Sequence, residues 1–148
     1  MAELAGAVGF RRFDTYRLVK SEDLNHHGTL FAGRSAEWFV ESAFVAAAHL
    51  VPPENIVCVQ VHGMHFSRPV NRGDVVRFSS RLVHAGRTSL VAHAVLCTAD
   101  DRQVVEGFVS FVHVDADGRP EPHGVSVLAG TDEELRIQER ARALGQRT

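Results

Sequence analysis

The chain of 148 residues is short enough for one domain and long enough to bury a core of its own. Its hydrophobic content of 45% and charged content of 23% are ordinary for a globular protein. The formal net charge of −2 argues against a nucleic-acid partner, because nucleic-acid-binding proteins are usually distinctly basic. No apolar run approaches the ~20 residues of a membrane span, so we expect no membrane partner.

The two cysteines, Cys58 and Cys97, are expected to be free thiols in a reducing compartment. Both lie in strand-like runs, and their spacing matches no metal-binding or redox motif. The first residues lack the basic-then-apolar layout of a signal peptide. The nine histidines are scattered, without a pair at helical spacing, so no metal site is expected. These features predict a cytoplasmic location.

One long helix is predicted near the start of the chain. Residues 10–20 alternate loosely and predict a first strand, and a polar, turn-prone stretch at 21–32 follows. From Gly33 to about Leu50, apolar side chains recur every three or four residues, which is typical of a helix with one buried face. Pro52, the first of two consecutive prolines, ends this helix. The apolar positions are Ala36, Phe39, Val40, Ala43, Ala47 and Leu50.

Four further strands are predicted in an antiparallel meander, at 55–62, 76–82, 88–98 and 103–114. Gly63 indicates a bulge or a close approach by another segment. A short C-terminal helix is expected at 131–144, where Thr131 and Glu134 fit a capping box. The whole chain, 1–148, is thus predicted as one α+β domain with its core at about 10–118. The apolar strand faces are Val57, Val59 and Val61; Val76, Phe78 and Leu82; Leu90, Ala92, Ala94 and Leu96; and Val105, Val109 and Phe111.

The start of the long helix carries groups suited to chemistry on a carbonyl. A helix N-terminus presents unpaired N–H groups and a partial positive charge. Gly33 lets a ligand oxygen approach the backbone there, Asn25 stands just upstream, and Glu37 and Glu41 share a helix face. Backbone donors, an amide and a carboxylate are the groups needed to hydrolyse an activated carbonyl. The alternatives are a turn residue at Asn25 and a solvated face for the two glutamates.

Four fragments of the chain, in this order, resemble the hotdog-fold acyl-CoA thioesterases of medium- and long-chain type. The resemblance covers about residues 20–118 and implies a curled antiparallel β-sheet wrapped around one long central α-helix. The fragments are Asn25, Gly-Thr-Leu-Phe-Ala-Gly at 28–33, Phe-Ser-Arg-Pro-Val-Asn-Arg-Gly-Asp at 66–74, and Gly-Arg-Thr-Ser at 86–89.

The resemblance also implies how such a protein works. It implies a homodimer with one continuous sheet, often assembled into tetramers or hexamers, with active sites at the dimer interface. A backbone N–H near Gly33 would bind the carbonyl oxygen of an acyl-CoA substrate, and no cofactor is needed because coenzyme A is part of the substrate. The nucleotide and pantetheine end would contact Gly86, Arg87, Thr88 and Ser89.

One position departs from the family pattern. Much of the family has Trp-Met-Asp-Glu on the helix, with the aspartate catalytic, whereas this chain has Trp38-Phe39-Val40-Glu41. We hypothesise that Glu41 takes over, with Glu37 as the weaker candidate. His62 stands where an acidic residue is common, and we predict that it binds substrate or acts as a base.

Three functions compete on this sequence. The leading one is hydrolysis of acyl-CoA to a free acid and coenzyme A, with Asn25 positioning the water. The alternative is a non-catalytic acyl-CoA binding or sensing protein on the same fold, favoured by the valine at position 40. A hotdog dehydratase ranks last, because the spacing of Asp23 and His27 does not match its catalytic pair.

Overall fold

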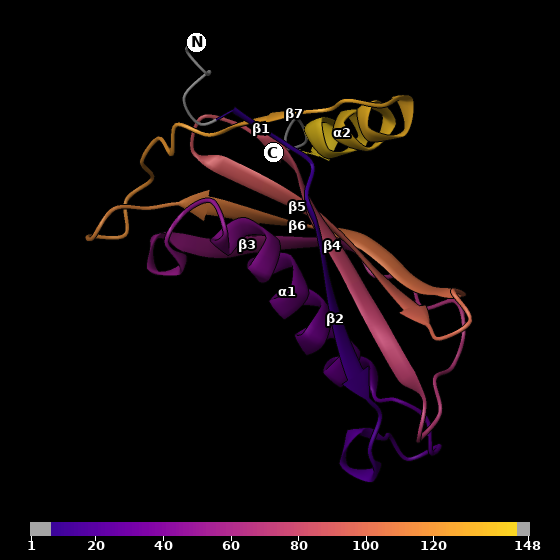
Figure 1. Cartoon of the computed structure of the whole chain (residues 1–148). Coiled ribbons are helices and arrows are strands. Elements are labelled where there is room, and N and C mark those ends of the chain that lie inside the picture. The colour runs from indigo at the N-terminus through magenta and orange to yellow at the C-terminus, as the bar shows by residue number, and fades with distance from the viewer. Residues whose placement is uncertain (1–6, 145–148) are drawn as a thin grey trace.

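The computed structural model describes residues 7–144 and contains one large sheet, one small sheet and two α-helices (Figure 1). The helices are α1 (Ala32–Ala48) and α2 (Asp132–Leu144), with short 3₁₀ turns η1 (Ser21–Asp23) and η2 (Pro53–Asn55). The strands are β1 (Ala7–Gly9), β2 (Arg12–Leu18), β3 (Ile56–Gly63), β4 (Val75–Ala85), β5 (Ser89–Thr98), β6 (Gln103–His113) and β7 (Ser126–Leu128).

The five-stranded antiparallel sheet has the order β2-β4-β5-β6-β3 and curls around α1 (Figure 1). The predicted meander is correct for β4, β5 and β6 but wrong for β3, which pairs with β6 at the far edge. The reason lies in the segment between β3 and β4. This segment crosses to the start of α1. There the Leu30 N–H donates to Val70 O at 2.8 Å, and Thr29 and Asn71 form an antiparallel β-bridge. A hairpin between β3 and β4 is thereby prevented.

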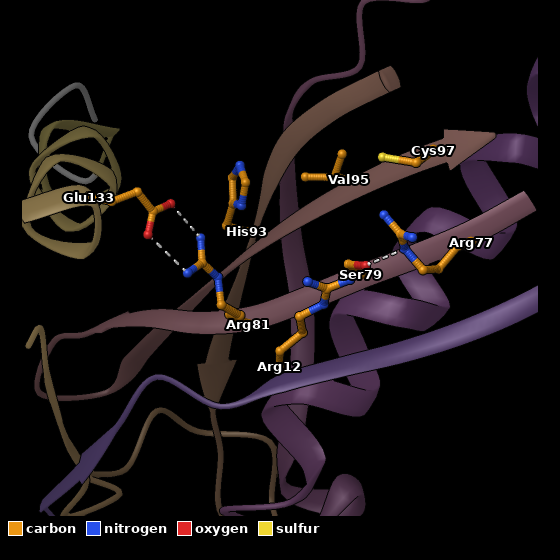
Figure 2. A pocket seen from close by; sticks show the side chains of 8 residues that line it. All are labelled: Arg12, Arg77, Ser79, Arg81, His93, Val95, Cys97 and Glu133. Atoms are coloured by element: carbon orange, nitrogen blue, oxygen red, sulfur yellow. Dashed lines mark hydrogen bonds and ion pairs between the residues drawn. The ribbon is translucent and has the colours of Figure 1, made fainter. Parts of the chain in front are cut away.

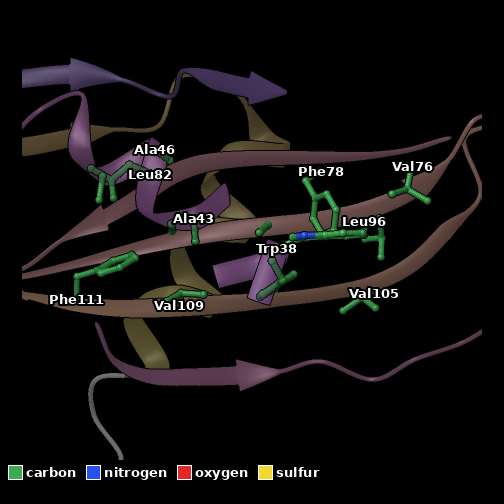
Figure 3. Packing of buried hydrophobic residues seen from close by; sticks show 14 of the residues in the cluster. Trp38, Ala43, Ala46, Val76, Phe78, Leu82, Leu96, Val105, Val109 and Phe111 are labelled. Carbon is green, nitrogen blue, oxygen red and sulfur yellow. The ribbon is translucent and has the colours of Figure 1, made fainter. Parts of the chain in front are cut away.

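Helix α1 packs on the inner face of the sheet, across β4 and β5. The apolar faces predicted for β4, β5 and β6 all point into this core (Figure 3). Trp38 meets Phe78 edge-on, with ring centroids 6.1 Å apart. Small residues let the helix lie close to the sheet, and Ser80 Oγ donates to the Ser42 carbonyl at 2.8 Å. The buried residues of α1 are Ser35, Trp38, Phe39, Ser42, Ala43, Ala46 and Ala47.

The buried face of α1 is therefore rotated from the predicted one. Phe39, Ala43 and Ala47 are buried as expected, whereas Ala36, Val40 and Leu50 are only partly buried. Serine and tryptophan side chains complete the buried face instead. Close packing of a helix on a sheet accommodates small residues and one large ring as well as it accommodates aliphatic residues. The spacing of apolar residues alone does not distinguish the predicted buried face of α1 from the observed one.

Helix α2 covers part of the outer face of the sheet, as Figure 1 shows. Ile137 and Ala141 pack there against Val83, Val91 and Phe108. Half of the predicted capping box is present: the Glu134 N–H donates to Thr131 Oγ1 at 3.1 Å, whereas Glu134 Oε1 accepts from the Gly130 N–H, at 2.8 Å, and not from the Thr131 N–H. The parallel pair β1–β7 was not predicted, because each strand has only three residues and no alternating pattern.

Strand β3 contains a bulge that changes the predicted faces. The register moves from Cys58 opposite Phe111 to Gln60 opposite Ser110, so Val59 is the extra residue. Val57 and Val61 consequently lie on opposite faces, and the prediction that the three valines share a face is wrong. The close approach predicted at Gly63 is confirmed, since a Cβ there would lie 3.2 Å from Glu106 O.

Candidate active site

The N-terminus of α1 has no side-chain cap. Phe31 is the N-cap residue, it makes no side-chain capping bond, and the first turn contains no acidic residue. The N–H groups of Ala32 and Gly33 precede the first intrahelical hydrogen bonds, which begin at Arg34. A Cβ at Gly33 would lie 2.5 Å from Cε2 of Phe31, so a side chain there requires the exposed Phe31 ring to move.

A cleft of 450 Å³ lies beside this helix start. Its size falls within the range of about 300–1,000 Å³ that is usual for small-molecule sites. Ala32 and Ser35 contribute the first turn of α1, and Phe66 to Val70 form the opposite side. The lining residues are Asn25, Leu30, Ala32, Ser35, Phe66, Ser67, Arg68, Pro69, Val70 and Val104, and none of these described residues carries a carboxylate or imidazole.

Asn25 lines the cleft and also builds the turn that precedes the helix. Its Oδ1 accepts hydrogen bonds from the N–H groups of His27 at 2.8 Å and Thr29 at 3.2 Å. Gly28 completes the turn with a φ of +84°, which glycine adopts readily. The geometry thus shows the turn role directly, and the catalytic role of Asn25 stays a prediction.

The two candidate carboxylates lie outside the cleft. Glu41 is exposed and forms an ion pair with Arg17 of β2. Glu37 is also exposed, and its Oε1 lies 3.1 Å from Nη1 of Arg34. Val40, at the family's aspartate position, is partly buried. Within one protomer, no acidic group of α1 therefore reaches the lining of the cleft.

His62 lies on the other side of the sheet. It is opposite Phe108 of the outer face, and its Nε2 lies 2.9 Å from Ser110 Oγ. Burial lowers the pKa of His62 and so favours its neutral form. It lines a second cleft, of 420 Å³, with Glu106 and Arg140.

The Gly86–Ser89 turn lies at the far end of the sheet. The Thr88 carbonyl accepts from the N–H of His113, the last residue of β6, at 2.7 Å. Val104, near the start of β6, lines the cleft at the helix start. The length of β6 therefore separates this turn from Gly33. Of the predicted site residues, only Asn25 lines the cleft, and Gly33 directly follows the lining residue Ala32 in the first turn of α1.

A third cleft, of 270 Å³, lies on the outer face between β4, β5 and α2 (Figure 2). It is lined by three arginines, which suggests an anion site at first sight. Each guanidinium already has a carboxylate partner within 3.1 Å, so the positive charge is compensated inside the fold. The pairs are Arg12 with Asp14, Arg77 with Asp101, and Arg81 with Glu133.

Two residues at the helix start were missed by the sequence analysis. Asp23 is buried, at 4% exposure, and pairs with Arg34 of the first turn of α1. The sequence carries a signal for this pair, because a basic residue in the first turn of a helix opposes the helix dipole and needs an acidic partner. Over residues 7–144, no cluster of metal-ligating side chains occurs, and no helix is long and apolar enough to span a membrane.

Comparison with known proteins places this geometry in a family. Residues 27–105, more than half of the chain, match the family model described as the thioesterase superfamily. The acyl-CoA thioester hydrolase YciA of Salmonella typhimurium is 30% identical over 116 residues, which are 71% of this chain and 84% of the relative. An uncharacterized acyl-CoA thioester hydrolase of Bacillus subtilis, YkhA, is 27% identical over 80% of this chain and 71% of its own.

Solved structures agree with this result. An apo-hexameric acyl-CoA thioesterase is 27% identical, with a TM-score of 0.77 over 91% of this chain and 88% of its own. An acyl-CoA hydrolase of Staphylococcus aureus, solved with butyryl coenzyme A, has a TM-score of 0.80 over 92% of this chain and 82% of its own. At 22% identity it supports the fold alone. The expected hotdog fold is confirmed, and the chain belongs to the thioesterase superfamily.

Proposed function

We propose that this protein is an acyl-CoA thioesterase, which hydrolyses the thioester of acyl-CoA to a free carboxylic acid and coenzyme A. The observation that carries the proposal is the 450 Å³ cleft beside the uncapped start of α1. Six of its ten lining residues are apolar, as an acyl chain requires, and one of them, Ala32, is the first residue of the helix. Family membership and the names of the relatives give the chemistry.

In the proposed reaction, water attacks the thioester carbonyl carbon and the carbonyl oxygen becomes negatively charged. The N–H of Gly33, aided by the helix dipole, donates to this oxyanion. The carbon–sulfur bond then breaks, and the coenzyme A thiolate takes up a proton. Asn25 would orient the water, and Glu41 would remove its proton. The reaction needs no cofactor beyond the coenzyme A of the substrate.

We further propose that the active unit is a homodimer joined through β3, within larger assemblies such as the hexamers of related thioesterases. Strand β3 is an edge strand, and Val57, Val59 and Val61 are 48%, 57% and 40% exposed there. An unpaired, apolar edge calls for another strand. A second copy of β3 in antiparallel pairing supplies one.

This pairing would also bring the Gly86–Ser89 turn of one protomer to the cleft of its partner. The Gly63 end of β3 lies at the cleft end of β6, and the Ile56 end lies opposite His113, next to the Gly86–Ser89 turn. Antiparallel pairing of two β3 strands sets the Gly63 end of one protomer beside the Ile56 end of its partner. Arg87, exposed on the turn, would then face the partner's cleft with a guanidinium suited to coenzyme A phosphates.

A non-catalytic acyl-CoA binding protein is the second candidate, favoured by the lack of a carboxylate among the described lining residues. Thiol release from acyl-CoAs of increasing chain length separates the two functions, measured for wild type, Glu41→Gln and the exposed control Glu54→Gln. The thioesterase proposal predicts turnover that Glu41→Gln lowers by about 10²-fold or more and Glu54→Gln leaves unchanged. Binding of acyl-CoA without turnover in wild type would refute it and leave the binding function.

If wild type is active and Glu41→Gln retains its turnover, the base is not Glu41, and Glu37 and His62 become the residues to replace.

We also propose a cytoplasmic location. The free thiols of Cys58 and Cys97 fit a reducing compartment. Fractionation of the source cells tests this location.

A further inference from the structure

Asp23 is the only buried carboxylate among residues 7–144. Its Oδ2 accepts a hydrogen bond from the Lys20 N–H at 2.9 Å, which closes the short turn η1. Its Oδ1 lies 3.2 Å from Nε of Arg34. A buried carboxylate is costly unless it is paired, so Arg34 is the residue that makes this burial tolerable.

Arg34 occupies an unfavourable place on its helix. It lies in the first turn of α1, where the positive end of the helix dipole repels a cation. The ion pair with Asp23 offsets this repulsion, and Nη1 makes a second contact with exposed Glu37 at 3.1 Å. A cation in the first turn of a helix is locally unfavourable. Its retention by a buried carboxylate indicates a functional role for the pair at the helix start.

The backbone of Asp23 is fixed to the same helix start. The Phe31 N–H donates to the Asp23 carbonyl at 2.9 Å, and Leu24 and Leu30 form an antiparallel bridge. Phe31 is the N-cap of α1 and Leu30 lines the cleft. Main chain and side chain of Asp23 therefore both attach the loop at 24–30 to the residues that begin the helix.

We propose that Asp23 and Arg34 are positioning residues for the thioesterase site. Together they hold the loop carrying Asn25 against the first turn of α1 and so fix the Gly33 N–H beside the cleft. Arg34 also neutralises the one buried carboxylate near the helix start, which would otherwise repel a developing oxyanion. This inference rests on the proposed function.

The test compares Asp23→Asn with Glu22→Gln, an exposed neighbour that loses the same charge and contacts only Lys20, at 3.8 Å. Asparagine keeps the shape of the side chain and removes its charge. In Asp23→Asn we expect kcat to fall at least about tenfold, with KM within about threefold, because the interaction lost is realised in the transition state. Glu22→Gln should behave like wild type in both constants.

A second readout does not depend on turnover. Amide hydrogen exchange of residues 24–33 should be at least about tenfold faster in Asp23→Asn than in Glu22→Gln, because the loop opens locally more often. Arg34→Gln leaves an unpaired buried charge, and adding Asp23→Asn to it should recover part of its kcat. That recovery distinguishes a coupled pair from two separate stability effects.

The outcomes separate this inference from the proposed function. Wild-type kcat and wild-type exchange in Asp23→Asn would overturn the positioning role. Slower turnover in proportion to a lower folded fraction, with KM and exchange of residues 24–33 unchanged in the folded protein, would also overturn it. If wild type hydrolyses no acyl-CoA, the proposed function fails, and exchange alone then decides whether the pair holds the loop.

Discussion

Arg17 of β2 and Glu41 of α1 form an ion pair across the helix–sheet boundary, although 24 residues separate them in the chain. The Arg17 guanidinium carbon also lies 5.2 Å from the centre of the Trp38 ring. Arg17 therefore links the candidate base to the large aromatic residue of the buried helix face. The pair fixes the outward direction of Glu41, and a role for Glu41 in hydrolysis must accommodate this partner.

The Arg17–Glu41 pair should contribute little to stability. Both side chains are largely solvated, at 40% and 61% exposure, and exposed pairs are worth about 0–1 kcal/mol. A double-mutant cycle with Arg17→Gln and Glu41→Gln, followed by urea unfolding, should give a coupling energy below about 1 kcal/mol. Arg17→Gln alone should cost more than Glu41→Gln, because it also removes the contact with Trp38. A coupling well above this bound would show that the pair is a main support of α1.

Gly107 of β6 should tolerate no side chain. A Cβ there would collide with the His62 carbonyl and lie 3.2 Å from both Cζ of Phe39 and the Met64 nitrogen. We expect Gly107→Ala to lower the free energy of unfolding by about 1–3 kcal/mol, as overpacking does. Gly9→Ala is the control, because nothing lies within 4 Å of that position. Equal stabilities of the two variants in chemical denaturation would show that β3 and β6 are farther apart than described.

Acid should destabilise the protein through the outer face. Burial lowers the pKa of His93 below 6.5, and the hydrogen bond from Arg140 lowers the pKa of Glu106 below 4.5. In both cases the unfolded chain takes up its proton at a higher pH than the folded chain does. The free energy of unfolding therefore falls as the pH falls, first through His93 and then through Glu106.

Calorimetry at about pH 7.5 and about pH 5.5 tests this effect, since histidine is the side chain whose ordinary pKa lies between these values. The melting temperature of wild type should be lower at the acidic value, and His93→Gln should show a smaller difference. Some difference will remain, because burial also lowers the pKa of His62 and His84. An identical pH response of wild type and His93→Gln would contradict the account of His93.

The edge strand should control assembly. A charge at Val59, which is 57% exposed on the bulge of β3, disfavours pairing with a second strand. We expect Val59→Lys to be monomeric in sedimentation and to lose thioester hydrolysis. Leu128→Lys, at a residue of similar exposure on β7, should keep the assembly of wild type. A dimeric Val59→Lys would place the interface elsewhere.

The parts of the fold that the sequence predicted are those in which one face alternates with the other. Leu90, Ala92, Ala94 and Leu96 could be assigned to one buried face of β5, because a slip of one residue would expose all of them. The same logic failed for β3, where the extra residue at Val59 moves Val57 and Val61 to opposite faces. The alternation of apolar residues in the sequence does not indicate where a β-bulge occurs.

The candidate site was predictable only where its residues are neighbours in the chain. Asn25 and Gly33 lie at one helix start, and the sequence placed them together. Arg17 as the partner of Glu41 and the cleft wall at 66–70 depend on how distant segments meet, which no local pattern reports. The burial of Asp23 is likewise a property of the assembled loop.

The central claim is that the Gly33 N–H stabilises the oxyanion of an acyl-CoA thioester. Thiol release by Gly33→Pro, which lacks this donor, is compared with thiol release by Gly33→Ala, which keeps it and meets the same Phe31 ring. Circular dichroism confirms that both variants are folded. The account predicts a kcat for the proline variant about 10²–10³-fold below that of the alanine variant. Equal kcat values in the two folded variants would contradict it.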